Sequence, residues 1–289
     1  MAKIVIAGCG DIGRRIADLA ARLGTAVTGI VRSGESCEAL ENAGYACLQM
    51  DFGDAPLPPV DVDGCDLLYL APPPRSGETD PLVGNFLDAL QGLPRRFLYL
   101  STTGVYGDAH GGWIDETSPV DARAGRAKRR LDAERRVAGA AKTRGFDHLI
   151  VRVPGIYGRD RLPLAKIRDR QPVLEADIAP FTNRIHEDDL AAIMLDLLVT
   201  GEPGEIYNVT DGNPSTMTEY FQTVARYAGL EPLPEIDMQA AERELSAGML
   251  SYLRESRKIS NAKLMRTIGT RLRYPTLTDG LEAIFGKPS

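Results

Sequence analysis

Three glycines, at positions 8, 10 and 13, have the spacing of a phosphate-binding turn. They follow a β-branched run and precede a stretch whose apolar residues recur at helical spacing. In that context Gly8 permits a tight turn, Gly10 lets the backbone approach a pyrophosphate, and Gly13 lets the helix pack against the strand. The helix start at Asp11 and Ile12 would present free N–H groups to the phosphates. The pattern therefore predicts a dinucleotide site; the alternative is a bare strand-to-helix turn.

The second strand-like run ends in Arg32 and Ser33. An NAD site usually has an acidic residue here, because a carboxylate accepts a hydrogen bond from the ribose 2′-hydroxyl. Arginine instead favours the 2′-phosphate of NADP, and the Ser33 hydroxyl would add a donor. The alternative is a solvated arginine after a strand. We therefore expect NADP as the cofactor, with NAD as the other candidate.

Further cofactor contacts are expected where other strands end. Asp51 and Phe52 follow the third strand at the expected adenine edge, where Asp51 would accept from the adenine amine. Aspartate after a strand is also ordinary turn chemistry. Ala71 is small enough to leave room for the cofactor, and Pro72 opens a loop that lacks N–H donors. Pro154, after the sixth strand, completes the expected contacts.

These residues need a scaffold that brings several strand ends together. Nearly continuous apolar runs alternate with helical patterns, which indicates a parallel sheet with helices on both faces. Right-handed crossovers make such a sheet doubly wound, as in a Rossmann fold. Strands are expected at 3–7, 25–31, 45–50, 66–71, 96–101, 148–153 and 205–209, and helices at 14–22, 35–43, 81–90, 121–144, 187–199 and 216–228.

The pattern divides this α/β chain into two units. Residues 1–153 are expected to form an NAD(P)-binding Rossmann domain, to which residues 184–209 return. After residue 153 the pattern loosens, and prolines divide the chain into short pieces. Residues 154–183 and 210–289 are therefore expected to form a smaller C-terminal α/β substrate lobe.

The 289-residue chain has the composition of an ordinary soluble globular protein, with 43% apolar and 26% charged residues. Its net charge of −6 argues against a nucleic-acid-binding protein, which works by neutralising phosphates. No apolar run reaches the roughly 18 residues of a membrane span, and the N-terminal run is too short for a signal peptide. We expect a monomer or homodimer that binds a small-molecule substrate and no membrane.

The four cysteines, Cys9, Cys37, Cys47 and Cys65, all fall in the first quarter of the chain. Their spacing matches no set of metal ligands. We therefore expect reduced thiols, no metal site and a cytoplasmic location.

Six further segments occur in an order that is typical of one family. The segment at 101–107 reads STTGVYG, and the others lie at 115–119, 151–158, 184–191, 206–209 and 256–269. Together with the glycine turn, they resemble the extended short-chain dehydrogenase/reductase family of NAD-dependent epimerases and dehydratases. The resemblance covers essentially the whole chain. It implies a Rossmann fold, an NAD(P) cofactor and hydride transfer.

That family's chemistry uses a Ser or Thr and a Tyr-x-x-x-Lys pair on one helix face. The resemblance places these residues at Thr102, Arg126 and Arg130. Because arginine keeps its proton at any usable pH, Arg126 cannot be the general acid, and such a loss typically lowers the rate about 10²- to 10⁴-fold. The chain is therefore similar to the atypical, YeeZ-like branch, which keeps the glycine turn and lacks the usual catalytic residues.

The resemblance implies a role for each of the three residues. Thr102 would orient the reacting oxygen, Arg126 would stabilise developing negative charge, and Arg130 would donate to the nicotinamide ribose. Water or a substrate group would supply the proton. Other side chains on loops or strand ends are weaker candidates for this role: Tyr106, Tyr157, His110 and His186, the last of which we expect to anchor a helix start.

Residues 123–136 carry seven basic and two acidic side chains. One interpretation is a solvated helix face. The other is that Arg126 and Arg130 line the cleft and hold an anionic substrate. Since residues four apart share a helix face, Lys128 and Arg129 should then point into solvent.

The sequence is compatible with three functions. The first is an atypical short-chain oxidoreductase that transfers hydride to or from a small or anionic carbonyl or alcohol. The second is a sugar-nucleotide epimerase, and the third is a non-catalytic NADP-binding sensor. The loss of the tyrosine counts against the epimerase and favours the sensor.

Overall fold

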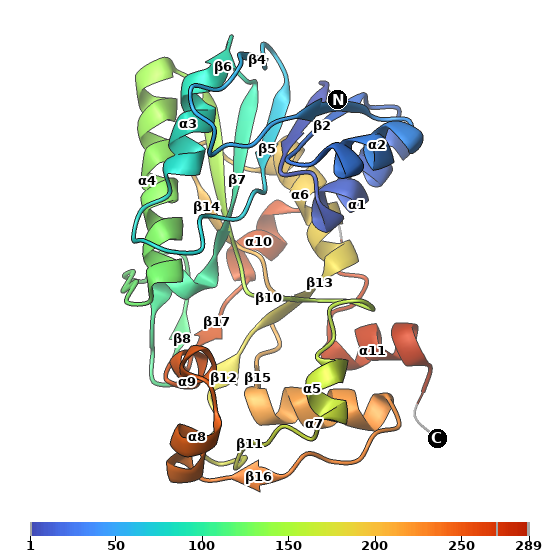
Figure 1. Ribbon diagram of the computed structural model, residues 1–289, viewed down its shortest axis with the longest axis vertical. Coiled ribbons are helices and arrows are strands. Elements are labelled where there is room, and N and C mark those ends of the chain that lie inside the picture. Colours follow the sequence, from blue (N-terminus) through green and yellow to red (C-terminus); the bar gives the residue numbers. More distant parts are fainter. Residues whose placement is uncertain (1, 270, 288–289) are drawn as a thin grey trace.

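The computed structural model of the protein describes residues 2–269 and 271–287. Seven strands form one sheet in the order β14-β9-β7-β5-β1-β2-β3, and every neighbouring pair is parallel (Figure 1). The strands are β1 (Ile4–Ala7), β2 (Val27–Val31), β3 (Ala46–Gln49), β5 (Asp66–Tyr69), β7 (Arg96–Thr102), β9 (Asp147–Val153) and β14 (Ile206–Asn208). The predicted doubly wound parallel sheet is confirmed.

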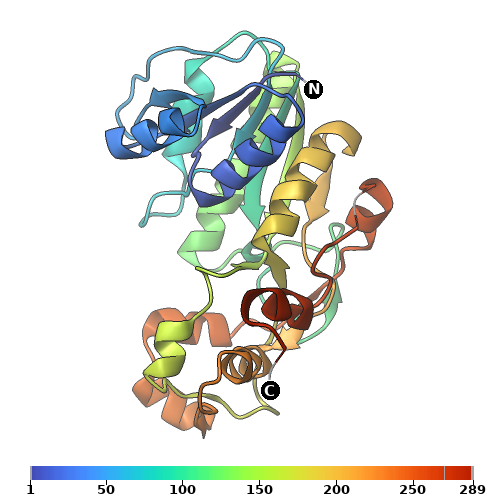
Figure 2. The ribbon, with the colours of Figure 1, turned by 90° about the vertical axis from the view of Figure 1, so that its right-hand side faces the viewer.

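Helices cover both faces of this sheet (Figures 1 and 2). One face packs against α1 (Asp11–Arg22) and α6 (Glu187–Thr200), and the other against α3 (Pro81–Ala89) and α4 (Gly125–Arg144). Successive strand residues alternate between the two cores, because side chains of a strand point to opposite faces. The remaining helix of this half, α2 (Gly34–Asn42), packs beside β2 and β3.

The strand order reverses beside β1. The chain runs outward from β1 to β2 and β3, and then crosses to β5 on the other side of β1. The carboxyl ends of β1 and β5 are therefore neighbours, with Ala7 paired to Tyr69. In open α/β sheets, ligands bind in the crevice outside such a reversal.

The second half of the chain builds a lobe beyond the carboxyl ends of the strands, in the lower part of Figure 1. Its own small cores join the helices to short strand pairs. Its elements are β10 (Gly155–Tyr157), α5 (Leu164–Arg168), β11 (Val173–Leu174), β12 (Phe181–Thr182), β13 (Arg184–His186), β15 (Ser215–Thr216), α7 (Met217–Tyr227), β16 (Glu235–Ile236), α8 (Met238–Glu244), α9 (Ala247–Leu253) and α11 (Leu277–Phe285). Other short elements are β4 (Val60–Asp61), β6 (Leu90–Gln91), η1 (Thr103–Tyr106), β8 (Trp113–Ile114), β17 (Lys258–Ile259) and α10 (Ala262–Thr267).

Observed elements begin and end within a few residues of the predicted ones. The largest shift is at α4, which begins at Gly125 instead of residue 121 because Ala124 is extended, with a ψ of 139°. In the described part of the chain, no helix combines the length and the apolar character that a membrane span requires.

The prediction of four reduced thiols was wrong for one pair. Cys37 on α2 and Cys47 on β3 form a disulfide, with their Cα atoms 5.6 Å apart. The two elements pack directly against each other, and this proximity cannot be read from a spacing of ten residues. Cys9 and Cys65 are free and buried.

One buried ion pair joins α4 to the sheet. Arg152 on β9 makes two hydrogen bonds to the Glu134 carboxylate, at 3.1 and 2.7 Å, and the Ser101 hydroxyl donates to the same carboxylate at 2.5 Å. The guanidinium also lies over the Tyr106 ring, whose hydroxyl donates to Asn208 on β14. Contacts around the Glu134–Arg152 pair therefore fix α4 and three strands relative to one another.

We predict that Arg152→Met lowers the free energy of unfolding by about 3–5 kcal/mol, because it leaves the Glu134 carboxylate buried without its cation. Urea denaturation measures the loss. The double variant Glu134→Leu/Arg152→Met should recover most of it, since the charge is then removed together with its partner. A loss below about 1 kcal/mol in the single variant would contradict this account of the pair.

Candidate functional site

The glycine turn after β1 has the geometry that a pyrophosphate needs. Gly8 has a φ of +81°, and a Cβ built on it would lie 2.5 Å from the backbone nitrogen of Ala71. At Gly13 a Cβ would come within 3.2 Å of Ile6 and Cys9 side-chain atoms, so this glycine lets α1 pack close to β1. A Cβ at Gly10 would meet no atom within 4 Å. The first and third glycines thus close the turn, and the second leaves its outer side open.

The start of α1 has free N–H donors that can bind an anion. Gly10 is the N-cap residue and, as a glycine, has no side chain that could cap the helix. Within the described residues, the N–H groups of Asp11, Ile12 and Gly13 have no acceptor. Open N–H groups and the helix dipole together favour a phosphate at this position. These residues therefore fit a dinucleotide cofactor.

Charged side chains connect this turn to the C-terminal lobe. Arg161, between β10 and α5, donates to the Asp11 carboxylate at 2.7 and 2.9 Å. It also lies 3.3 Å from the buried Glu187 carboxylate, which pairs with Arg15 at 2.6 Å. The phosphate end of the site is therefore bordered by a link between the two halves of the molecule.

At the expected adenosine end, the candidate side chains differ in whether they are already hydrogen-bonded within the protein. Arg32 follows β2 with its side chain exposed. The Ser33 hydroxyl caps α2, accepting from the Ser36 N–H and donating to the Ser36 hydroxyl at 2.9 Å. Asp51 accepts from the Gly53 N–H, which is the turn interaction that its position also suggested. Arg32 is thus the candidate whose side chain is free to reach a ligand.

Phe52 is a core residue. Its side chain is buried, and its ring lies 5.6 Å from the Tyr69 ring and 5.0 Å from the Phe86 ring. The Asn85 amide donates to its carbonyl. The Phe52 ring therefore belongs to the core, and the expected cofactor contact at this position stays a prediction. Ala71 is buried beside Gly8, and Pro72 is exposed.

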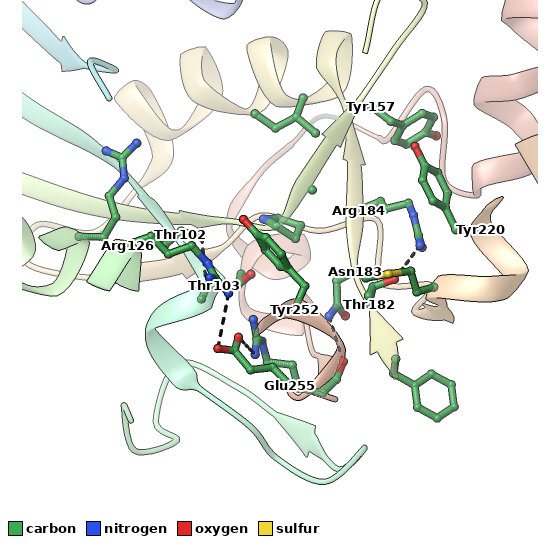
Figure 3. Close-up of a pocket in the computed structure, with 18 of the residues that line it drawn as sticks. Thr102, Thr103, Arg126, Tyr157, Thr182, Asn183, Arg184, Tyr220, Tyr252 and Glu255 are labelled. Carbon is green, nitrogen blue, oxygen red and sulfur yellow. Dashed lines mark hydrogen bonds and ion pairs between the residues drawn. The ribbon is translucent and has the colours of Figure 1, made fainter. Parts of the chain in front are cut away.

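A cavity of about 500 Å³ lies between the carboxyl ends of the strands and the C-terminal lobe (Figure 3). The sheet half contributes residues from the loop after β5, from the ends of β7 and β9, and from α4: Pro73, Thr102, Thr103, Gly104, Arg126, Arg130 and Pro154. The lobe contributes aromatic and charged residues, among them Tyr157, Phe181, Arg184, Tyr220, Tyr252, Glu255 and Arg257. The cavity therefore brings all three expected catalytic residues to one wall and adds a second wall from the lobe.

Thr102 and Arg130 are held at the ends of strands. The Thr102 hydroxyl accepts from the Gly104 N–H at 3.2 Å, which leaves its own proton free to donate. Arg130 Nη1 donates to the carbonyls of Ala71 and Leu100 and to the Tyr99 hydroxyl, at 3.0–3.3 Å. Its guanidinium is thus fixed where β5 and β7 end, beside the glycine turn.

Arg126 is engaged by the lobe. Its Nη1 donates to the Ser251 hydroxyl at 2.9 Å, its Nη2 lies 3.6 Å from the Glu255 carboxylate, and its Cζ lies 3.9 Å from the centre of the Tyr252 ring. A cation over an aromatic face is attracted to it electrostatically. Arg126 therefore holds the Tyr252 ring between α4 and the lobe, where both side chains line the cavity.

Arg129 does not point into solvent as expected. It is buried, and its Nη1 donates to the Gly77 carbonyl at 2.6 Å. Lys128 pairs with Glu78. The prediction for Arg129 was wrong because the loop before α3 folds over the start of α4, which helical spacing alone cannot reveal.

The other proton-donor candidates are buried in structural roles or exposed to solvent. Tyr157 and Tyr106 are buried, and their hydroxyls donate to Thr276 and Asn208. His110 is fully exposed on its loop. Burial lowers the pKa of His186 to about 4, and its neutral Nδ1 accepts from the Asp188 N–H at the start of α6. The predicted anchoring role of His186 is confirmed.

Tyr252 and Arg184 are cavity residues that the sequence did not single out. Tyr252 belongs to a stretch without any recognisable motif. Arg184 opens the family-like segment at 184–191, but nothing in that segment shows that its side chain faces a cavity.

Comparison with known proteins agrees with the fold and the glycine turn. Residues 8–200, more than half of the chain, match the family model described as NAD(P)H-binding. The chain belongs to the NAD(P)H-binding family. It is 26% identical to protein YeeZ of Escherichia coli K12, over 95% of this chain and 97% of YeeZ. The resemblance to the YeeZ-like branch is thus confirmed.

Solved structures of similar proteins extend over nearly the whole chain. A conserved protein of unknown function from Silicibacter pomeroyi is 28% identical, with a TM-score of 0.84 and 98% of both chains covered. A protein assigned as an NAD-dependent epimerase/dehydratase from Methylobacillus flagellatus is 27% identical, with a TM-score of 0.68 and coverage of 98% and 97%. This NAD(P)H-binding protein therefore shares its fold with the epimerase/dehydratase group.

We predict that Gly10→Val abolishes NADPH binding measurable by calorimetry while the melting temperature stays near that of the parent. The added side chain meets no protein atom within 4 Å, but it fills the space through which a pyrophosphate reaches the turn. Gly139→Val, at a site on α4 that is equally open, is the matched control and should bind normally. An unchanged dissociation constant in Gly10→Val would show that the cofactor does not bind at this turn.

Proposed function

We propose that the protein is an NADP-dependent oxidoreductase of the atypical short-chain type, which acts on a small anionic carbonyl or alcohol. The cavity between the strand ends and the lobe carries this proposal, because it is lined by Thr102 and Arg130, and Arg130 donates to the carbonyl of Ala71, which packs against Gly8 of the glycine turn. When bound, the nicotinamide supplies or accepts the hydride. The protein's own residues must orient the substrate, balance charge and move one proton.

Thr102 is suited to orient the reacting oxygen. Its hydroxyl oxygen is occupied by the Gly104 N–H, so its proton is directed to other acceptors, and its side chain lines the cavity. Arg130, fixed at the ends of β5 and β7, is suited to donate to the cofactor's ribose and to offset negative charge that develops on the substrate.

Tyr252 is the proton donor that we propose. Its side chain is half exposed, lines the cavity and points its hydroxyl away from Glu255 into the open space (Figure 3). Among the described residues this hydroxyl has no hydrogen-bond partner, whereas the Tyr157 hydroxyl is committed to a carbonyl. During reduction the substrate oxygen would take the Tyr252 proton, and solvent would restore it. Arg126 then acts as a positioning residue for a phenol from the lobe.

NADP is preferred in this proposal because the exposed Arg32 occupies the place of the ribose-binding acid. We predict that the parent binds NADP at least about tenfold more tightly than NAD, and that Arg32→Asp removes or reverses this preference. Calorimetric titration of both cofactors measures it. Arg22→Asp, at the exposed far end of α1, controls for the change of net charge. Equal affinities in the parent would rule the preference out.

We predict that Tyr252→Phe lowers kcat for NADPH-dependent carbonyl reduction by about 10²- to 10⁴-fold with little change in KM. A panel of keto acids and phosphorylated aldehydes, followed by loss of NADPH absorbance, first identifies a usable substrate. Tyr220→Phe removes the hydroxyl of another phenol in the same cavity but keeps the ring on which Arg184 lies, so it should have a much smaller effect on kcat. Equal losses in the two variants would argue against Tyr252 as the donor.

The same panel separates this function from its alternatives. Tight NADP binding without turnover of any carbonyl would favour the non-catalytic sensor. Turnover of a nucleotide sugar without net consumption of cofactor would favour the epimerase. A cytoplasmic location and a monomeric or dimeric state stay predictions, and the former would place the Cys37–Cys47 pair among reducing thiols.

A further inference from the structure

Arg184 is a buried cation on the lobe side of the cavity. It lies on β13, its relative exposure is 5%, and its side chain lines the cavity (Figure 3). Burying a guanidinium is unfavourable unless its charge is compensated. The groups around it therefore decide whether Arg184 supports the fold or serves a ligand.

The immediate partners of Arg184 are all neutral. Its Nη1 donates to the Ser215 hydroxyl at 2.8 Å, its Nη2 donates to the Thr182 hydroxyl at 2.6 Å, and its Cζ lies 3.9 Å from the centre of the Tyr220 ring. Within residues 2–269 and 271–287, no carboxylate lies within the ion-pair distance of 4.0 Å. These contacts fix the plane of the guanidinium and leave its charge unpaired.

Asp211 is a nearby acid that acts on Arg184 only at longer range. Burial raises the pKa of Asp211 to about 7, so this carboxyl is only partly ionised near neutral pH. Burial also lowers the pKa of Arg184 to about 10, which still leaves it cationic there. Glu219 also acts on Arg184 only at longer range, so no carboxylate of the described chain is in direct contact with the guanidinium.

Other arginines of the cavity are already engaged. Arg257 pairs with Glu255 at 2.9 Å and donates to the Gly107 carbonyl, and Arg126 lies against the same carboxylate. Arg130 donates to two carbonyls and a hydroxyl. Arg184 differs from all three because its contacts include neither a carboxylate nor a backbone carbonyl.

We propose that Arg184, held in place by the Thr182 and Ser215 hydroxyls and the Tyr220 ring, binds an oxyanion group of the substrate, a carboxylate or a phosphate. Such a group would accept the guanidinium N–H donors left unused by the two hydroxyls and would neutralise the buried charge. The anion holder is then on the lobe, and not the Arg126 and Arg130 pair suggested by helical spacing. The substrate would carry its acid at one end and its reacting carbonyl or alcohol near Thr102 at the other.

This assignment rests on the proposed function only in taking the cavity as the substrate site. Anion binding itself requires neither NADP nor turnover. If the carbonyl panel shows no activity and anions still bind at Arg184, the oxidoreductase fails while the anion site stands. If NADPH is consumed and Arg184 binds no anion, the anion site fails while the oxidoreductase stands.

The first test compares two buried arginines with opposite environments. Arg184→Met should leave the melting temperature unchanged or raise it, because it removes a charge that the fold does not compensate. Arg152→Met, which strips Glu134 of its partner, should lower the melting temperature strongly. A loss in Arg184→Met as large as that in Arg152→Met would show that Arg184 serves the fold, and would overturn the proposal.

The second test measures anion binding by calorimetry at constant ionic strength, with inorganic phosphate and malonate as separate probes. We expect at least one probe to bind the parent and to bind Arg184→Met about 10- to 100-fold more weakly, since charge-assisted hydrogen bonds are lost. The stronger probe identifies the carboxylate or the phosphate as the natural group. Arg135→Gln, an exposed arginine on α4, should bind like the parent.

Two results of this titration would overturn the proposal. One is equal affinity of both probes for the parent and Arg184→Met, and the other is no binding of either probe to the parent. Arg184→Lys provides a variant that keeps the charge. It should bind with intermediate affinity, because a lysine lacks the planar fork that pairs with an oxyanion.

Discussion

The close approach of two backbones at the sheet reversal is the constraint on which the rest of this molecule depends. The turn after β1 passes so near the end of β5 that a Cβ at Gly8 would overlap the backbone of Ala71. Because of this contact, the start of α1 points its open N–H groups over the crevice. It also places the Ala71 carbonyl where Arg130, in the cavity wall, donates to it. A side chain at Gly8 would push the turn after β1 away from Ala71 at the end of β5.

Arginine side chains carry much of the long-range organisation. Arg152 locks α4 to three strands, Arg161 links the lobe to the start of α1, and Arg126 links α4 to α9. Each joins segments far apart in the chain, and each has a carboxylate within ion-pair distance. Among the described residues, Arg129 and Arg130 lack a carboxylate partner but donate to backbone carbonyls. Arg184 differs from all of these because its guanidinium meets only two hydroxyls and a ring, which is why it points to a ligand and the others to structure.

If Arg126 stands at the position of the family's tyrosine, as we propose, its contacts give that replacement a structural explanation. An arginine at position 126 cannot give a proton, but it can hold an aromatic ring, and it holds the ring of Tyr252. The phenol would then return to the reacting position from the other wall of the cavity. In such an arrangement the site has its proton donor only when the lobe packs against α4.

The sequence by itself determined the Rossmann sheet and the glycine turn, and the family resemblance singled out Thr102, Arg126 and Arg130, which line one cavity. These features follow from local periodicity and from motifs whose residues are close together in the chain. Only the tertiary structure decided the partners of Arg126, the burial of Arg129, the Cys37–Cys47 bond and the unpaired charge of Arg184. Each of these depends on packing between different elements; the Arg126 contact, for instance, spans 125 residues. Periodicity fixes which way a side chain leaves its own element, but not what another element brings to meet it.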